Sequence, residues 1–166
     1  MSVQDFLKFR KDDIEREAAE WPCNDGPTAL AFALGASLEQ VREACSVAGL
    51  RKHQRRREEL MNMNMMCKAI NALDVEYRAS ESTWPERGLV QWMICGPWKF
   101  HAFHHGHKDA HYYRRWAGVN GDYMFDLLGG LRLKKNWQDI VIPQHFARTS
   151  RSTGQHYFTN LIEFDL

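Results

Sequence analysis

Residues 24–35 constrain the fold of this chain most strongly, and they read Asn-Asp-Gly-Pro-Thr-Ala-Leu-Ala-Phe-Ala-Leu-Gly. The Asp-Gly-Pro sequence favours a turn that opens a helix, and Gly35 is suited to ending that helix. Alanine, leucine and phenylalanine would occupy nearly every side of a helix over residues 26–34. We therefore predict a helix that is buried all round.

Residues 111–126 predict a β-hairpin, because Asn120 and Gly121 favour a two-residue turn between two strand-like segments. His111 begins the first of these strands and Asp126 ends the second. We expect the side chains of His111 and Asp126 to lie within hydrogen-bonding reach on neighbouring strands. We also expect them to lie near the N-terminus of the helix over residues 26–34.

The remaining pattern places helices before strands. Ser37 and Gln40 fit a capping box, which predicts a helix that begins there and ends near Gly49. Apolar residues at near-helical spacing predict a third helix over residues 58–73. Further strand candidates are residues 75–78, 89–95 (a strand or a short helix), 98–103, 137–142 and 156–164. This order is typical of an α+β fold, with N-terminal helices packed on a C-terminal antiparallel sheet.

The chain has 166 residues, which we interpret as a single domain. Residues 1–20 fit an N-terminal helical arm, and residues 131–166 supply C-terminal strands. With 44% hydrophobic residues the chain can bury a core. The formal net charge of +1 gives no overall attraction to nucleic acid or to a membrane surface.

The cysteine spacing and the hydropathy pattern indicate a cytoplasmic protein. The four cysteines form no C-x-x-C pair, so we expect reduced intracellular thiols instead of a zinc ribbon or a thioredoxin motif. The N-terminus lacks the basic stretch and apolar run of a signal peptide. No apolar run approaches the roughly 18 residues that a membrane-spanning helix needs, so we expect no membrane contact.

Three segments together resemble papain-like cysteine peptidases, in particular the family that cleaves double-glycine leader peptides and its small phage-type relatives. The segments are residues 24–31 (NDGPTALA), residues 48–52 (AGLRK) and residues 111–126. The resemblance covers residues 21–130 and implies a papain-like fold. In that fold a nucleophile at a helix N-terminus faces a sheet that carries a histidine base and an orienting acid or amide. By this resemblance His111 is the base and Asp126 is the orienting acid.

Asp25 stands where the family has its nucleophilic cysteine. A carboxylate attacks amides poorly, whereas an aspartate N-cap stabilises a helix by about 1 kcal/mol. Cys23 is the other candidate nucleophile, although an extended chain puts its thiol about 6–7 Å from the usual place. Residues 18–21 also lack the family's oxyanion-stabilising glutamine, which favours a degenerate site. If the site is active, its residues are Cys23, His111 and Asp126.

Histidines are concentrated in residues 101–111, at His101, His104, His105, His107 and His111. His101 also begins an alternating segment and is the second candidate for the base. His111 is preferred because only His111 has an aspartate at the end of the partner strand. Imidazoles at alternate strand positions could bind Zn²⁺, but no cysteine or glutamate lies at ligand spacing. We therefore expect a solvated histidine-rich hairpin, with no metal and no cofactor, and keep metal binding as the alternative.

Five basic residues form the one strong basic patch, at Arg51, Lys52, Arg55, Arg56 and Arg57. Such a patch could bind an acidic protein surface or nucleic acid, or it could be a solvated loop between helices. The neighbouring residues 61–66 are rich in methionine, which suits either core packing or an adaptable binding surface.

These features favour a catalytically degenerate papain-like protein that binds a host protein as an effector or inhibitor, of phage or mobile-element type. The first alternative is an active cysteine peptidase or acyl-transfer enzyme that uses Cys23 with His111 and Asp126. The second alternative is a nucleic-acid-associated factor that uses the basic residues 51–57.

Overall fold

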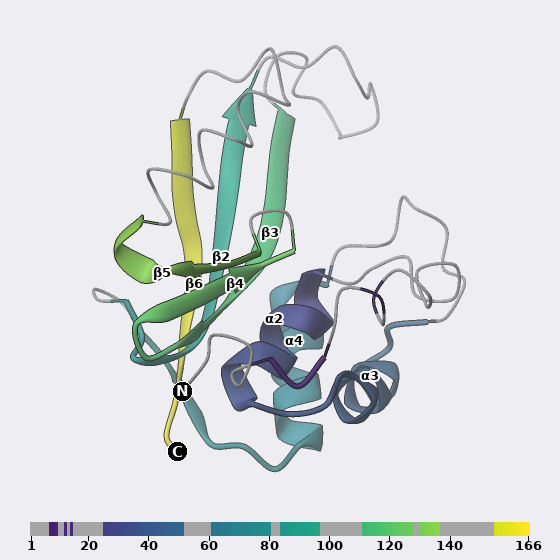
Figure 1. The fold of residues 1–166 in the computed structure, drawn as a ribbon. Coiled ribbons are helices and arrows are strands. Elements are labelled where there is room, and N and C mark those ends of the chain that lie inside the picture. Colours follow the sequence, from purple (N-terminus) through teal and green to yellow (C-terminus); the bar gives the residue numbers. More distant parts are fainter. Residues whose placement is uncertain are drawn as a thin grey trace.

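The structure is a computed structural model that describes residues 7–9, 12, 14, 25–51, 61–80, 84–96, 111–127, 130–136 and 155–166. Within these ranges the chain forms helices and a six-stranded antiparallel sheet, which confirms the predicted α+β class. Helices α2, α3 and α4 lie together on one side of the sheet (Figure 1). The candidate site forms where α2 meets the sheet.

Capping side chains define where α3 and α4 begin. Helix α2 is Asp25–Leu34, α3 is Leu38–Val47 and α4 is Met63–Ala72. The predicted capping box is confirmed, because Ser37 and Gln40 bond reciprocally at the start of α3. The predicted start of α4 near residue 58 is wrong. Asn62 is extended, and its Oδ1 accepts the Met65 N–H over 2.9 Å, so the side chain caps a helix that begins at Met63.

The strands follow the chain order β1 Tyr77–Ala79, β2 Arg87–Gly96, β3 His111–Asn120, β4 Tyr123–Asp126, β5 Gly130–Leu133 and β6 Gln155–Phe164. In space their order is β1-β6-β2-β3-β4-β5. The predicted hairpin is confirmed, because Asn120 pairs with Tyr123 across a turn in which Gly121 has a φ of 58°. The strand candidates over residues 98–103 and 137–142 lie outside the described residues.

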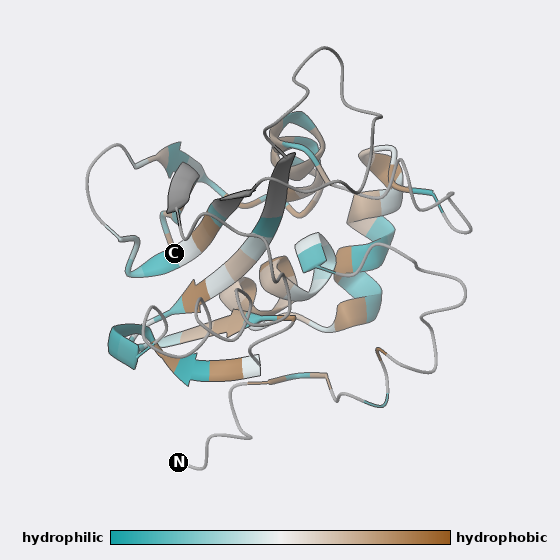
Figure 2. Ribbon diagram, turned by 90° about the horizontal axis from the view of Figure 1, so that it is seen from above, coloured by the Kyte–Doolittle hydropathy of each residue, from teal (hydrophilic) through white to brown (hydrophobic). Residues whose placement is uncertain are grey.

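Helix α2 is the centre of the core. Residues 25–33 are all buried, which confirms the predicted helix that is covered on every side. The helix packs directly on β3, where a Cβ atom at Gly118 would collide with the Ala29 carbonyl group. Trp116 on β3 and Phe125 on β4 belong to the same core as Phe32 of α2. Hydrophobic residues occur on the helices and the strands alike (Figure 2).

The part of β3 and β4 that faces away from α2 is buried as well. Because side chains alternate along a strand, the neighbours of Trp116 and Phe125 project to this second face. Its residues include Arg115, Ala117, Val119, Met124 and Asp126, and all of them are buried. In the described part of the chain, no helix is long and apolar enough to cross a membrane.

Candidate functional site

Asp25, the first residue of α2, joins the helix to the sheet. Its Oδ2 accepts a hydrogen bond from the Trp116 backbone N–H on β3 over 3.4 Å. The Asp25 backbone carbonyl in turn accepts a hydrogen bond from the Thr28 hydroxyl over 3.2 Å. A negative charge is favoured at this place, because the N-terminus of a helix carries partial positive charge. The predicted N-cap role of Asp25 stays a prediction, whereas the bond of its carboxylate to the Trp116 N–H fixes β3 against the start of α2.

Asp126, the predicted orienting acid, forms an ion pair with Arg115. The Arg115 Nε lies 3.4 Å from Asp126 Oδ2, and the two side chains are 7% and 0% exposed. The pair is diagonal across the β3–β4 ladder, because Asp126 lies directly opposite Ala117. Diagonal neighbours on one sheet face are within reach of a long side chain such as arginine. The sequence analysis overlooked Arg115, although its position two residues from the partner of Asp126 is the signal that could have identified it.

The expected proximity of His111 and Asp126 is wrong. Counted from the turn, Asp126 lies three residues after Tyr123, and its partner Ala117 lies three residues before Asn120. His111 lies six residues beyond Ala117 on β3, which at about 3.3 Å per residue is a separation of about 20 Å. It pairs instead with Gly96 at the far end of β2. The register of the hairpin thus separates the predicted base from the predicted acid.

Several predicted site residues are not covered by the structure. Cys23, His101, His104, His105 and His107 lie outside the described residues, as do Lys52, Arg55, Arg56 and Arg57. Arg51 is described, and it is exposed just after the end of α3. Among the described residues, no group of three or more histidine, cysteine, aspartate or glutamate side chains could hold a metal ion.

The Cys45 thiol is unsuited to nucleophilic chemistry. Its side chain lies in the core beside Met61, with 3.9 Å between the two sulfur atoms. Burial raises the pKa of Cys45 to about 12, against a smaller lowering by the nearby Arg42 charge. A thiol with such a pKa is almost entirely protonated at neutral pH, and the thiolate is the reactive form.

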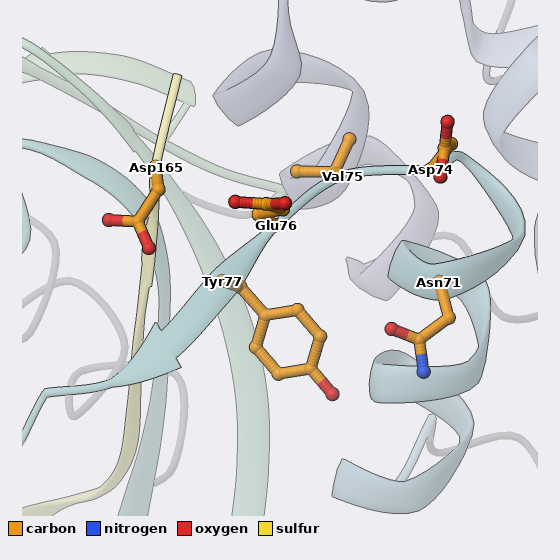
Figure 3. Close-up of a pocket in the computed structure, with 6 residues that line it drawn as sticks. All are labelled: Asn71, Asp74, Val75, Glu76, Tyr77 and Asp165. Atoms are coloured by element: carbon orange, nitrogen blue, oxygen red, sulfur yellow. The ribbon is translucent and has the colours of Figure 1, made fainter.

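A surface hollow of about 560 Å³ lies at the β1 edge of the sheet, where α4 leads into β1. Figure 3 shows the residues that line it, which are Asn71, Asp74, Val75, Glu76, Tyr77 and Asp165. Hydrogen bonding to Cys67 raises the pKa of the Tyr77 hydroxyl. Strand β1 is separated from β3 by β6 and β2, so this hollow does not include the residues around Asp25.

Comparison of the chain with protein-family models, with curated proteins and with solved structures finds no match.

Proposed function

We propose that this chain is a catalytically degenerate papain-like protein, of phage or mobile-element type, that acts by binding a host protein. The observation that carries the proposal is the role of Asp25. Its carboxylate occupies the start of α2 and bonds to the backbone of β3. This arrangement holds helix and sheet together with an aspartate, and not a cysteine, at position 25.

The pairing of Asp126 with Arg115 also supports the loss of catalysis at this site. General-base catalysis needs a side chain that can take up a proton near neutral pH. Asp126 instead contacts Arg115, whose guanidinium group stays protonated in proteins. An arginine in this place can neutralise a carboxylate but cannot activate a nucleophile.

We assign binding to the basic residues 51–57, of which Arg51 is exposed beside the end of α3. Closely spaced positive charges speed the encounter with an acidic protein surface and make that encounter sensitive to salt. The binding partner is therefore expected to be a protein with an acidic patch.

Affinity capture with three baits tests this function. The baits are the wild-type protein, the charge-reversed variant Arg55→Glu/Arg56→Glu/Arg57→Glu, and the variant Cys23→Ala/His111→Ala. Proteins captured from host lysate are identified by mass spectrometry, and circular dichroism confirms that each bait is folded. We expect the wild-type protein and Cys23→Ala/His111→Ala to capture the same partner, and the charge-reversed variant to lose it.

Two outcomes would replace the proposal. The cysteine enzyme would be favoured if the charge-reversed variant still captured the partner and only Cys23→Ala/His111→Ala lost biological activity. Capture that disappears after nuclease treatment of the lysate would favour the nucleic-acid-associated factor.

A further inference from the structure

Strands β1 and β5 are the two outer strands of the sheet, and within the described residues each has a partner strand on one side only. The open edge of a sheet presents backbone N–H and C=O groups that can pair with a strand of another chain. Strand β1 has three residues and β5 has four, so each edge offers a short ladder. The two edges lie on opposite sides of the sheet, so one does not block the other.

The ladder between β1 and β6 shows which backbone groups of β1 point outward. In an antiparallel pair, residues that exchange hydrogen bonds alternate with residues whose N–H and C=O point away from the partner strand. The Ser80 N–H donates to the Leu161 carbonyl over 2.9 Å, one position beyond the end of β1. By alternation, the backbone groups of Ala79 and Tyr77 face outward. In the described part of the chain, no hydrogen bond uses these outward groups.

The same alternation identifies the outward groups of β5. The Lys134 N–H donates to the Asp122 carbonyl over 2.7 Å, which extends the ladder between β4 and β5 by one pair. Leu131 and Leu133 therefore have outward backbone groups. The Leu131 carbonyl accepts a bond of 3.4 Å from the exposed Arg132 side chain, which an incoming strand could displace.

The β1 edge carries an excess of negative charge. Residues 74–79 and 161–165, which form this edge of the sheet, hold four carboxylates and one guanidinium group. Figure 3 shows three of these carboxylates around the surface hollow beside β1, on Asp74, Glu76 and Asp165. All three residues are exposed. This edge therefore favours a partner that brings positive charge.

The β5 edge carries the opposite charge. Residues 130–136 hold three cationic side chains and no acidic one, and the cations are Arg132, Lys134 and Lys135. Pairing of two β1 edges, or of two β5 edges, would bring like charges together, which is destabilising. Pairing of β1 with β5 brings opposite charges together. The charges thus favour a contact between unlike edges.

We infer that the partner of these edges is a second copy of this chain, whose β5 edge adds to the β1 edge of the first copy and continues the sheet across the contact. The outward backbone groups of Tyr77 and Ala79 pair with those of Leu131 and Leu133, and the basic side chains beside β5 lie against the acidic hollow beside β1. Because the two surfaces differ, the contact is head to tail, and a dimer keeps one open β1 edge and one open β5 edge for further copies. The short strands bury little surface, so association is weak. This inference does not depend on the proposed binding of a host protein.

Edge-blocked variants test the contact by sedimentation velocity. Proline at an outward position removes the N–H that an incoming strand uses and spares the ladder within the chain. Ala79→Pro blocks the β1 edge, and Leu133→Pro blocks the β5 edge. We expect the wild-type protein to form dimers and larger species between about 10 μM and 1 mM, and each variant alone to stay monomeric. An equimolar mixture of the two variants should form dimers and nothing larger, because each variant supplies the edge that the other lacks.

Charge variants give a second test that leaves the backbone unchanged, and they decide the matter if the proline variants do not fold. Asp74→Asn/Glu76→Gln, and separately Lys135→Gln, should raise the dissociation constant at least about threefold, as should an increase in salt from about 50 to 500 mM. Glu39→Gln/Glu43→Gln removes two negative charges from exposed positions of α3 and serves as the matched control, with an unchanged dissociation constant. Circular dichroism checks that each variant is folded.

A wild-type protein that stays monomeric over this concentration range would overturn the inference. Association that is equal in the charge variants and in their control would also overturn it, as would a mixture that associates no more than its two components. Dimers of Leu133→Pro alone would show that β1 pairs with β1, and dimers of Ala79→Pro alone would show that β5 pairs with β5. Either result would replace the contact between unlike edges. None of these results changes the expected capture of a host protein, so the two failures are distinguishable.

Discussion

The indole Nε1 of Trp116 donates a hydrogen bond to the backbone carbonyl of Met61 over 2.6 Å, and this bond ties the central strand to the segment that precedes α4. Trp116 and Met61 are each 1% exposed, so this hydrogen bond lies in the core, away from solvent. The contact therefore fixes the position of α4 relative to the sheet.

Trp116→Phe tests how much this hydrogen bond contributes to the free energy of unfolding. Phenylalanine keeps an aromatic ring in the core but leaves the buried Met61 carbonyl without its indole donor. Removing one partner of a buried hydrogen bond costs about 1–3 kcal/mol, so the free energy of unfolding should fall by at least that amount. Urea unfolding followed by circular dichroism measures the change. Val47→Ala, at an exposed position of α3, serves as the control and should have little effect.

Asp126→Asn should destabilise the protein more than a typical surface substitution. The amide would leave the buried Arg115 charge without its carboxylate, and breaking a buried ion pair costs about 3–5 kcal/mol. Replacing both residues, as Arg115→Met/Asp126→Asn, removes both charges of the pair and should cost less than Arg115→Met and Asp126→Asn added together. Urea unfolding of all three variants decides the matter. Additive losses would mean that the two side chains stabilise the protein independently, by packing, and not through their ion pair.

Local sequence signals predicted the framework of the fold correctly. The Ser37–Gln40 capping box and the Asn120–Gly121 turn each depend on residues that are close in sequence, so their geometry follows from local chemistry. The burial of α2 was also predictable, because apolar residues surround it.

The candidate site was harder to predict because its contacts join distant segments. The Asp25–Trp116 bond spans 91 residues, and nothing near Asp25 in the sequence specifies it. The pairing of Arg115 with Asp126 does follow from counting away from the turn. The expected proximity of His111 and Asp126 was wrong because it relied on the ends of the strands and not on the register between them.

Cys45 should resist alkylation in the folded protein. With a pKa of about 12, only roughly one thiol in ten thousand is ionised at pH 8, and the core also blocks the reagent. Iodoacetamide labelling at pH 8, mapped by mass spectrometry, should leave Cys45 unmodified in buffer and modify it in concentrated guanidinium chloride. Labelling of Cys45 in buffer at the rate of an unfolded cysteine would show that α3 and α4 separate readily.

The ion pair between Arg78 on β1 and Glu163 on β6 should make stability depend on acidic pH. Arg78 Nη2 lies 2.8 Å from Glu163 Oε2, and this hydrogen bond lowers the pKa of Glu163 below its ordinary value of 4.5. A carboxylate whose pKa is lowered by folding contributes stability above the pKa of the unfolded chain, and that contribution is lost as the pH falls through the folded value.

Glu163→Gln should therefore have a lower free energy of unfolding than the wild-type protein at pH 7 and at pH 5. This difference should shrink as the pH falls below about 4.5. Arg78→Met should show the same trend, because it removes the other partner of the pair. The Arg78 side chain is 64% exposed, so added salt should also reduce the difference. Urea unfolding between pH 3 and pH 7 measures both effects. A difference that stays constant across this range would mean that Glu163 stabilises β6 by packing and not by its charge, since packing against β1 does not titrate.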